Sequence, residues 1–336
     1  MDTTTISNCA VFDGVRIYEN ASVTIGGGKV LRLEEAPPMG EASKRFLMPG
    51  LIDGHTHLYT PEQMDTLVRF GVTATCSVDV SRKLADRSRV LKLHTSRTMA
   101  LGNISDGRAY VEREIGLGAD YIKVILEQPA IMAPKTMAPA VLRDIVQTAH
   151  AHGLKVAAHA VAINMVRLAV ESGVDILIHV PMTEPFPEEL AAQIAAQHMA
   201  IVPTLVMMKA FANDPRFSRY QPEHYPNAEA AVRLLHRMGV PILVGTDASD
   251  VPYVPKVWYG ISMHQEMELL AQAGIPLPDV LRGATGTMAD CFGIPNIGKI
   301  APGYPADLIL LDGRPDLTIT DSQKLSQIWA DGIPQR

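Results

Sequence analysis

Two histidines, one residue apart, are the first candidates for chemistry in this chain of 336 residues. His55 and His57 lie near the end of "FLMPGLIDGHTHLY" at positions 46–59, where an apolar run indicates a buried strand. Residues two apart in a strand share a face, so both imidazoles would point at one spot. This arrangement suits a metal site. A polar turn that ends a buried strand would contain the same residues, and the rest of the chain must decide between these interpretations.

Four further polar residues lie in or at the ends of predicted strands: Lys123 in "ADYIKVILE", His159 in "LKVAAH", His179 in "VDILIH" and Asp247 in "VPILVGTD". Each one alone has an ordinary structural explanation, such as a satisfied buried histidine or an aspartate that caps a turn. The C-terminal ends of barrel strands meet at one mouth, however, so the six side chains would converge there. Imidazole and carboxylate together favour Zn2+, Mn2+, Co2+ or Fe2+ over Ca2+ and Mg2+.

The elements that must position these residues are βα units. From Gly71 onward, short apolar runs alternate with helical patterns, which indicates a parallel sheet. Eight strands are predicted, which is enough to close a (β/α)8 TIM barrel, and the third has the weakest strand signal. The predicted strands are the run ending in "HTH", "GVTATCSV", "RTMALG", "ADYIKVILE", "LKVAAH", "VDILIH", "MAIVPTLV" and "VPILVGTD".

The two ends of the chain differ from its middle. Residues 1–47 and 298–336 contain strand-like stretches such as "VTIGGGKVLRLEE" and "PADLILLDG", without a helical period. We therefore expect both termini to form one small composite β-domain, similar to a β-sandwich. Residues 48–297 would then form the metal-dependent hydrolase barrel.

The composition excludes several function classes. Hydrophobic residues make up 47% of the chain, charged residues 20%, and the net charge is -6 without a basic run. We expect no nucleic-acid or membrane partner, and a small-molecule substrate instead. Three widely spaced cysteines form neither a disulfide framework nor a zinc site. With no leader pattern or membrane-length apolar run, a cytoplasmic homo-oligomer is expected.

Several motifs resemble a known family. "MPGLIDGHTH", "IKV", "AAHA", "LIH" and "GTDAS" are similar, in this order, to the metal-ligand motifs of the amidohydrolase superfamily, and the later "GKIAPGYPADLILLDGRP" is similar to its C-terminal signature. The likeness is nearest to the branch of Xaa-Pro dipeptidases (prolidases) and imidazolonepropionase-like enzymes. It implies a binuclear centre with two divalent metal ions, for which zinc is the first expectation. One ion would be held by His55, His57 and Asp247 and the other by His159 and His179.

Lys123 would bridge the two metals in this family. A free ammonium in an apolar strand beside two cations would be desolvated and repelled, which lowers its pKa from about 10.4. The neutral amine can react with carbon dioxide, and the resulting carboxylated lysine is an anionic bridging ligand. The alternative is a salt bridge between Lys123 and Asp247 in a degenerate site. In the catalytic interpretation, a metal-activated hydroxide attacks an amide, cyclic amide, peptide or ester bond, and Asp247 transfers the proton.

Two alternatives remain open. The first is a mononuclear deaminase or imidazolonepropionase-type hydrolase, many of which carry a glutamate three residues after the fifth-strand histidine. Here that position is Ala162, after His159, so the usual proton shuttle is missing. The second is a non-catalytic assembly protein on the same fold. Such relatives typically lose metal ligands, whereas all six positions are filled here.

The sequence says least about the substrate. The long connection at 208–227 is rich in aromatic residues and could cover the site as a lid, or it could be a surface elaboration. Other loops are short, so a dipeptide substrate should not be assumed, and a lactam, aryl amide or ester is equally open. The residues expected to contact substrate are Tyr59, Tyr220, His224, Tyr225 and Trp258.

Overall fold

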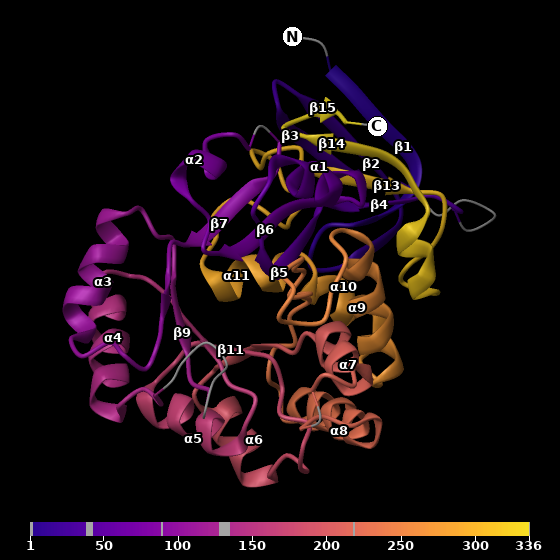
Figure 1. Cartoon of the computed structure of the whole chain (residues 1–336). Helices are drawn as coiled ribbons and strands as arrows, with labels where there is room; N and C mark the ends of the chain where they lie inside the picture. Colours follow the sequence, from indigo (N-terminus) through magenta and orange to yellow (C-terminus); the bar gives the residue numbers. More distant parts are fainter. Residues whose placement is uncertain (1–2, 38–42, 89, 128–134, 218, 336) are drawn as a thin grey trace.

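The computed structural model describes residues 3–37, 43–88, 90–127, 135–217 and 219–335. Strands from both chain ends lie together in one sheet, and the βα units of the middle of the chain occupy the rest of the molecule (Figure 1). The fold is mixed α/β and contains parallel sheets, as the alternating pattern predicts. In the described part of the chain, no helix combines the length and apolar composition needed to cross a membrane.

The sheet at the chain ends has seven strands in the order β15-β14-β13-β4-β1-β2-β3. Alternate residues of β2 are buried, as expected for a sheet with one covered face. Both predicted terminal segments therefore contribute to one sheet, whereas a two-sheet sandwich is not seen among the described residues. The strands are β1 (Thr3–Phe12), β2 (Ile17–Gly26), β3 (Lys29–Glu35), β4 (Phe46–Pro49), β13 (Leu308–Leu311), β14 (Leu325–Ala330) and β15 (Ile333–Pro334).

The middle of the chain forms two parallel sheets, β5-β6-β7 and β12-β11-β10-β9-β8. Most of their residues are buried, which is typical of parallel strands covered on both faces. The strands are β5 (Leu51–His57), β6 (Val72–Val78), β7 (Lys92–Ser96), β8 (Met99–Ala100), β9 (Ile122–Ile125), β10 (Val156–His159), β11 (Ile176–Ile178) and β12 (Ala200–Val202).

The third predicted strand is the point where the two parallel sheets separate. The predicted stretch "RTMALG" contains only β8, which pairs with β9, while the preceding "KLHTS" forms β7, which pairs with β6. The turn between them is held by the buried Glu114, whose carboxylate accepts hydrogen bonds from Thr98 N at 2.8 Å and Thr98 Oγ1 at 2.6 Å. The polar side chains of "KLHTS" hide this strand from a hydrophobicity pattern.

The eighth predicted strand, "VPILVGTD", does not form a continuous ladder. Its described residues make isolated parallel bridges, Ile201 with Ile242 on one side and Thr56 with Ala248 on the other. Two backbone hydrogen bonds accompany them, from Leu243 N to Ile201 O at 2.8 Å and from Gly54 N to Val244 O at 2.9 Å. Segment 241–248 therefore contacts one strand from each parallel sheet.

The helices follow the predicted amphipathic pattern. In α4, residues Leu142, Ile145, Val146 and Ala149 are buried, and the turn after the helix reaches Gly153 in the left-handed conformation. The α-helices are α1 (Pro61–Arg69), α2 (Arg82–Ala85), α3 (Gly107–Gly116), α4 (Pro139–Ala151), α5 (Ile163–Ser172), α6 (Glu188–Ala196), α7 (Leu205–Asn213), α8 (Tyr225–Arg237), α9 (Ile261–Gln272), α10 (Leu277–Gly283) and α11 (Gly286–Phe292). The 3-10 helices are η1 (Pro222–His224) and η2 (Ile319–Gln323).

Candidate functional site

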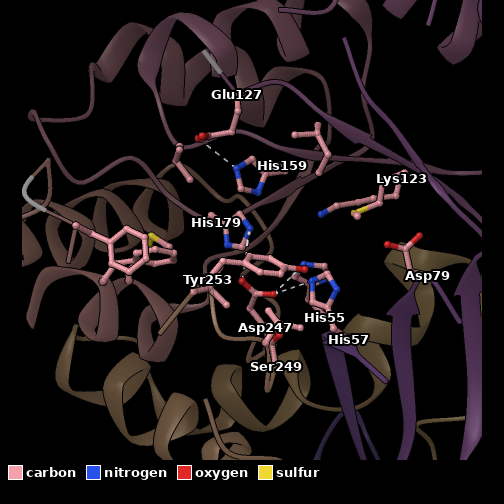
Figure 2. A pocket seen from close by; sticks show the side chains of 18 of the residues that line it. His55, His57, Asp79, Lys123, Glu127, His159, His179, Asp247, Ser249 and Tyr253 are labelled. Carbon is pink, nitrogen blue, oxygen red and sulfur yellow. Dashed lines mark ion pairs between the residues drawn. The ribbon is translucent and has the colours of Figure 1, made fainter. Parts of the chain in front are cut away.

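One pocket contains all six residues that the sequence places at strand ends (Figure 2). They come from β5, β9, β10, and the residues that follow β11 and segment 241–246. The cavity volume is about 170 Å³, below the roughly 300–1,000 Å³ of many ligand pockets, which favours a compact ligand. The lining residues include His55, His57, Tyr59, Asp79, Met99, Lys123, Ile125, Glu127, His159, Val161, His179, Met208, Phe211, Phe217, Tyr220, Asp247, Ser249, Val251, Tyr253 and Val254.

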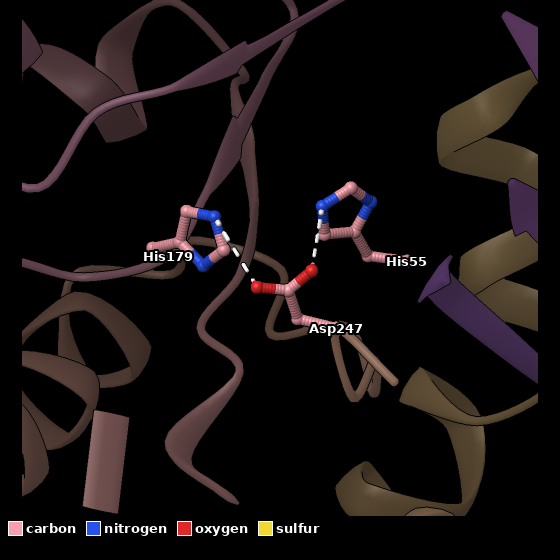
Figure 3. Close-up of side chains that lie close together, drawn as sticks. All are labelled: His55, His179 and Asp247. Carbon is pink, nitrogen blue, oxygen red and sulfur yellow. Dashed lines mark ion pairs between the residues drawn. The ribbon is translucent and has the colours of Figure 1, made fainter. Parts of the chain in front are cut away.

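Three of these residues form a compact group of ligand atoms (Figure 3). One atom each of His55, His179 and Asp247 lies within 4.8 Å of the other two. The two carboxylate oxygens of Asp247 face different imidazoles: Oδ1 is 3.4 Å from His55 Nε2, and Oδ2 is 3.9 Å from His179 Nε2. His57 Nε2 also lies 3.1 Å from Asp247 Oδ1. This set of nitrogen and oxygen donors suits a divalent transition metal or zinc.

The backbone is strained where two of these donors emerge. His179 has φ 71° and Asp247 has φ 57°, in the left-handed region that residues other than glycine rarely adopt. Hydrogen bonds of 2.8 Å, from His179 N to Val202 O and from Asp247 N to His55 O, hold this conformation. Such conformations cost of order 1–3 kcal/mol each and cluster at functional sites. The strain turns both side chains out of the strand direction and into the pocket.

Burial keeps two of the imidazoles neutral. Desolvation, with the nearby Lys123 and the other histidines, holds the pKa of His55 well below its usual range, and the pKa of His179 is lowered for similar reasons. His179 Nδ1 lies 2.7 Å from Thr204 Oγ1. If Nδ1 carries the proton and donates to this hydroxyl, the lone pair of Nε2 faces the carboxylate of Asp247. A neutral imidazole held in this way is prepared for a cation.

Lys123 is the strongest indication that the pocket holds a further group. It is 1% exposed, and its Nζ has no hydrogen-bond partner among the described residues. Burial lowers its pKa to about 7, although the charge of Asp247 raises it. The salt bridge between Lys123 and Asp247, the degenerate alternative, is therefore not formed. A partnerless buried amine beside histidine and carboxylate donors fits a carboxylated lysine at a metal centre.

Asp53 supports the site through hydrogen bonds to the backbone, and it is not among the residues predicted from the sequence. It is fully buried and accepts hydrogen bonds from Thr246 Oγ1 at 2.7 Å, Thr246 N at 3.0 Å and His55 N at 3.2 Å. Burial raises its pKa to about 7 against these hydrogen bonds. The carboxyl group thus joins the backbone next to Asp247 to the backbone of His55. Its position two residues before His55 could have indicated it, because both lie on one face of β5.

Glu127 was also missed. Its carboxylate Oε1 lies at an ion-pair distance of 3.3 Å from His159 Nε2, at the pocket wall (Figure 2). The signal in the sequence is alternation, since Lys123, Ile125 and Glu127 are two residues apart and all three line the pocket. His159 packs edge-on against His179, with ring centroids 4.4 Å apart. Glu127 therefore faces the donor cluster from the side of β9.

Aromatic residues close another side of the pocket. Phe211 and Phe217 pack edge-on with ring centroids 4.7 Å apart, and Tyr220 lies 5.6 Å from Phe211. All three line the pocket, as does Tyr59. Phe211 belongs to α7, and Phe217 and Tyr220 lie between α7 and η1, where Ser218 is outside the described residues. The predicted long connection at 208–227 is therefore shorter than expected, because α7 extends to Asn213 and α8 begins at Tyr225. We call Phe211, Phe217 and Tyr220 the aromatic wall.

The buried Glu266 of α9 holds the helix that begins this wall. It is fully buried and accepts hydrogen bonds from Leu205 N at 2.8 Å and Val206 N at 2.7 Å, at the N-terminus of α7. Burial raises its pKa to about 8. The start of α7 is thereby tied to α9.

Three other predicted substrate contacts lie outside the described pocket wall. His224 accepts a hydrogen bond from Gln221 N at 3.1 Å and caps η1. Tyr225 is buried at the start of α8, and Trp258 is 61% exposed beneath Lys256, whose Nζ is 4.1 Å from its ring centroid. None of the three is among the described residues that line the cavity. Periodicity gives no direction for loop residues, so the sequence could not show this.

The chain is similar in sequence to known proteins. The Amidohydrolase family model matches residues 105–335, more than half of the chain. Adenine deaminase of Nitratidesulfovibrio vulgaris is 25% identical over 331 residues, covering 90% of this chain and 52% of that protein. Imidazolonepropionase of Thermoplasma acidophilum is 25% identical over 166 residues, covering 42% and 40%. The chain thus spans about half the length, or less, of these curated relatives.

A solved structure extends the likeness to the whole fold. A Xaa-Pro dipeptidase with bound methionine in its active site superimposes with a TM-score of 0.82 at 19% identity, covering 100% of both chains. At this identity the superposition speaks for the fold alone. Together with the family match over residues 105–335, it leads to one conclusion: the chain belongs to the amidohydrolase family.

Proposed function

We propose that the protein is a metal-dependent hydrolase that cleaves a carbon–nitrogen bond of a small molecule. The observation that carries this proposal is the buried, partnerless Nζ of Lys123 next to the ligand group of His55, His179 and Asp247. A buried amine without a partner is costly, and a protein retains one where it serves a bound group. Family membership and the curated relatives support the same class of reaction.

The proposed architecture is a (β/α)8 barrel spanning residues 48–297, with residues 1–47 and 298–336 as a composite β-domain. The bridges of segment 241–248 to β12 and to β5 support closure on one side. On the other side, β7 and β8 follow one another in the chain and pair with β6 and β9. The active site would lie at the C-terminal ends of the strands, where barrel enzymes carry it.

The residues fit two divalent cations, of which zinc suits the donors best. His55, His57 and Asp247 would hold one ion, His159 and His179 the other, and Lys123, carboxylated by carbon dioxide, would bridge them. When bound, such ions would polarise a carbonyl and lower the pKa of a bound water to about 7.

The side chains of this chain would supply positioning and proton transfer. Asp247 Oδ1 faces His55 and His57 at the centre of the cluster, so this carboxylate can accept a proton from the attacking water and deliver it to the leaving nitrogen. The neutral imidazoles of His55 and His179 can each donate a nitrogen lone pair to a metal ion without first losing a proton. The aromatic wall would shield the reacting bond from bulk water.

The test combines metal analysis with a hydrolysis panel of amides, lactams and esters. Lys123→Ala should lose bound metal and lower kcat/KM by at least about 1,000-fold, and short carboxylic acids should restore part of both. Lys155→Ala is the matched control, because Lys155 pairs with Asp175 at 2.7 Å outside the pocket. Full activity and metal content in Lys123→Ala would contradict the bridge. A wild-type protein that binds no metal would contradict the whole proposal and favour an assembly protein.

A second candidate function is a deaminase, and one observation favours it. Although Ala162 takes the place of the usual glutamate, Glu127 lies 3.3 Å from His159 Nε2 and could move protons there. Adenine deaminases are also among the relatives. A panel of purines and pyrimidines, assayed for released ammonia, separates the two candidates. Turnover that disappears in Glu127→Gln would support the deaminase.

A further inference from the structure

The charges in the pocket wall are mostly negative. Asp79 follows β6, Glu127 follows β9, and both line the cavity together with Asp247 (Figure 2). Among the described lining residues, Lys123 is the only lysine or arginine, and the proposed function commits it to the metal centre. A negatively charged part of a substrate would therefore meet carboxylates at the wall and have no cationic partner there.

Two arginines lie near the mouth: contacts direct Arg216 elsewhere, whereas the charge of Arg219 acts on Glu127 and favours its ionised form. Arg216 donates to the carboxylate of Asp214 and to the carbonyl of Pro252, so its guanidinium is engaged. Arg219 is exposed, and its guanidinium carbon lies 5.8 Å from the ring centroid of Tyr220. Neither of them is among the residues that line the cavity.

The rest of the pocket wall is largely apolar, with the neutral side chains of Tyr59, Ser249 and Tyr253 among its described residues. The aromatic wall continues into Val161, Val251 and Val254. Such a surface favours the burial of an aromatic or branched apolar group, and it offers an anion only neutral hydroxyl donors and no positive charge. Glu127 adds an acceptor on the wall for a hydrogen-bond donor or a positive charge.

We infer that the substrate is a compact apolar amide without a free carboxylate, and that Glu127 discriminates against anionic substrates. This inference rests on the proposed hydrolysis and names its substrate class. The carbon–nitrogen bond breaks, water supplies the new carbon–oxygen bond, and the leaving nitrogen takes a proton, so the products are a carboxylic acid and an amine. Like charges placed opposite each other are an established means of rejecting a wrong ligand.

A matched pair of amides tests this inference. N-(3-phenylpropanoyl)pyrrolidine and N-(3-phenylpropanoyl)proline share the scissile bond and differ only in the carboxylate. For the metal-loaded protein, we expect kcat/KM and affinity, measured by isothermal titration, to be at least about tenfold higher for the pyrrolidine amide. Equal values, or a preference for the proline compound, would overturn the inference. A preference for the proline compound that disappears in Arg219→Ala would identify Arg219 as a carboxylate receptor and overturn it as well.

Variants at Glu127 sharpen the test. Glu127→Gln keeps the shape and removes the charge, so the ratio between the two compounds should fall to about threefold or less, and Glu127→Arg should reverse it. Glu223→Gln, an exposed carboxylate on η1, should leave the ratio unchanged. An unchanged ratio in Glu127→Gln would contradict the role of Glu127. If the metal-loaded protein binds the pyrrolidine amide more tightly but cleaves no amide at all, the proposed hydrolysis fails while this selectivity stands.

Discussion

The terminal region contains a buried basic side chain that is paired with carboxylates, whereas the pocket contains one without a partner among the described residues. In the terminal region, the guanidinium of Arg314 is 10% exposed and donates to Asp316 at 2.6 and 2.8 Å and to Glu19 at 3.0 Å. In the pocket, Lys123 is 1% exposed and has no partner among the described residues. A buried charge with a purely structural role is paired, because an unpaired one costs several kcal/mol. The difference supports the proposal that the pocket binds a further group.

Removing the paired charge should have the largest effect on stability. Arg314→Met leaves the carboxylate of Asp316, only 5% exposed, without its partner, and we expect the free energy of unfolding to fall by about 3 kcal/mol. Urea denaturation at neutral pH measures it. Arg16→Met is the control, since Arg16 is exposed and lies 3.9 Å from Glu35, and its stability should match the wild type. Equal free energies of unfolding for Arg314→Met and Arg16→Met would contradict the expected cost of leaving Asp316 unpaired.

A pH-dependent effect of similar size is expected at His264 of α9, which links η2 of the terminal region to the residue after α1. It is fully buried. Its Nδ1 lies 3.0 Å from Ser322 Oγ in η2, and its Nε2 lies 3.0 Å from Phe70 O. Burial lowers its pKa to about 4, although the hydrogen bond to Phe70 raises it.

The sign of the pH effect follows from this lowered pKa. The unfolded chain takes up the proton near pH 6.5 and the folded chain only near pH 4. The stability that the neutral ring provides is therefore complete above about pH 6.5 and is lost as the pH falls to about 4, by up to about 3 kcal/mol. Across this range, the free energy of unfolding should change less with pH in His264→Gln than in the wild type or in His152→Gln, a control at the exposed histidine that follows α4. Equal slopes would contradict the assignment.

Removing the unpaired charge should have the smallest effect, and in the opposite direction. In the metal-free protein, Lys123→Met should raise the free energy of unfolding by about 1 kcal/mol, because an apolar side chain replaces a desolvated amine. The gain should vanish in the presence of zinc, which stabilises only the wild type. Lys155→Met, which breaks an ion pair, should show no gain. A loss of stability in metal-free Lys123→Met would mean that the amine is satisfied in solution.

The sequence revealed residues whose positions follow a regular period. The six strand-end residues were found because strand alternation and parallel packing give their side chains a shared direction. The same period could have revealed Asp53 and Glu127. It could not reveal β7, whose polar residues break the apolar pattern, or the bridged character of segment 241–248. Hydrogen bonds to neighbouring strands decide those two features, and they are set by the packing of the whole sheet.

Loop residues mark the limit of sequence reasoning at the site. Tyr59 and Tyr220 line the cavity, while His224 and Trp258 do not, and all four are polar or aromatic residues in connections. Without a period, the direction of such side chains depends on local caps and contacts, such as the hydrogen bond that places His224 in η1.

The buried contact between Glu266 and the first turn of α7 divides that helix into an anchored and an adaptable end. At the anchored end, the backbone donates hydrogen bonds to Glu266 of α9, and these bonds do not involve the metal-ligand residues. The other end carries Phe211, which lines the pocket, and passes into a segment where Pro215 and Arg216 are exposed. Substitutions there can therefore alter which molecules enter while leaving the reactive centre intact, so selection can exchange substrates without rebuilding the chemistry.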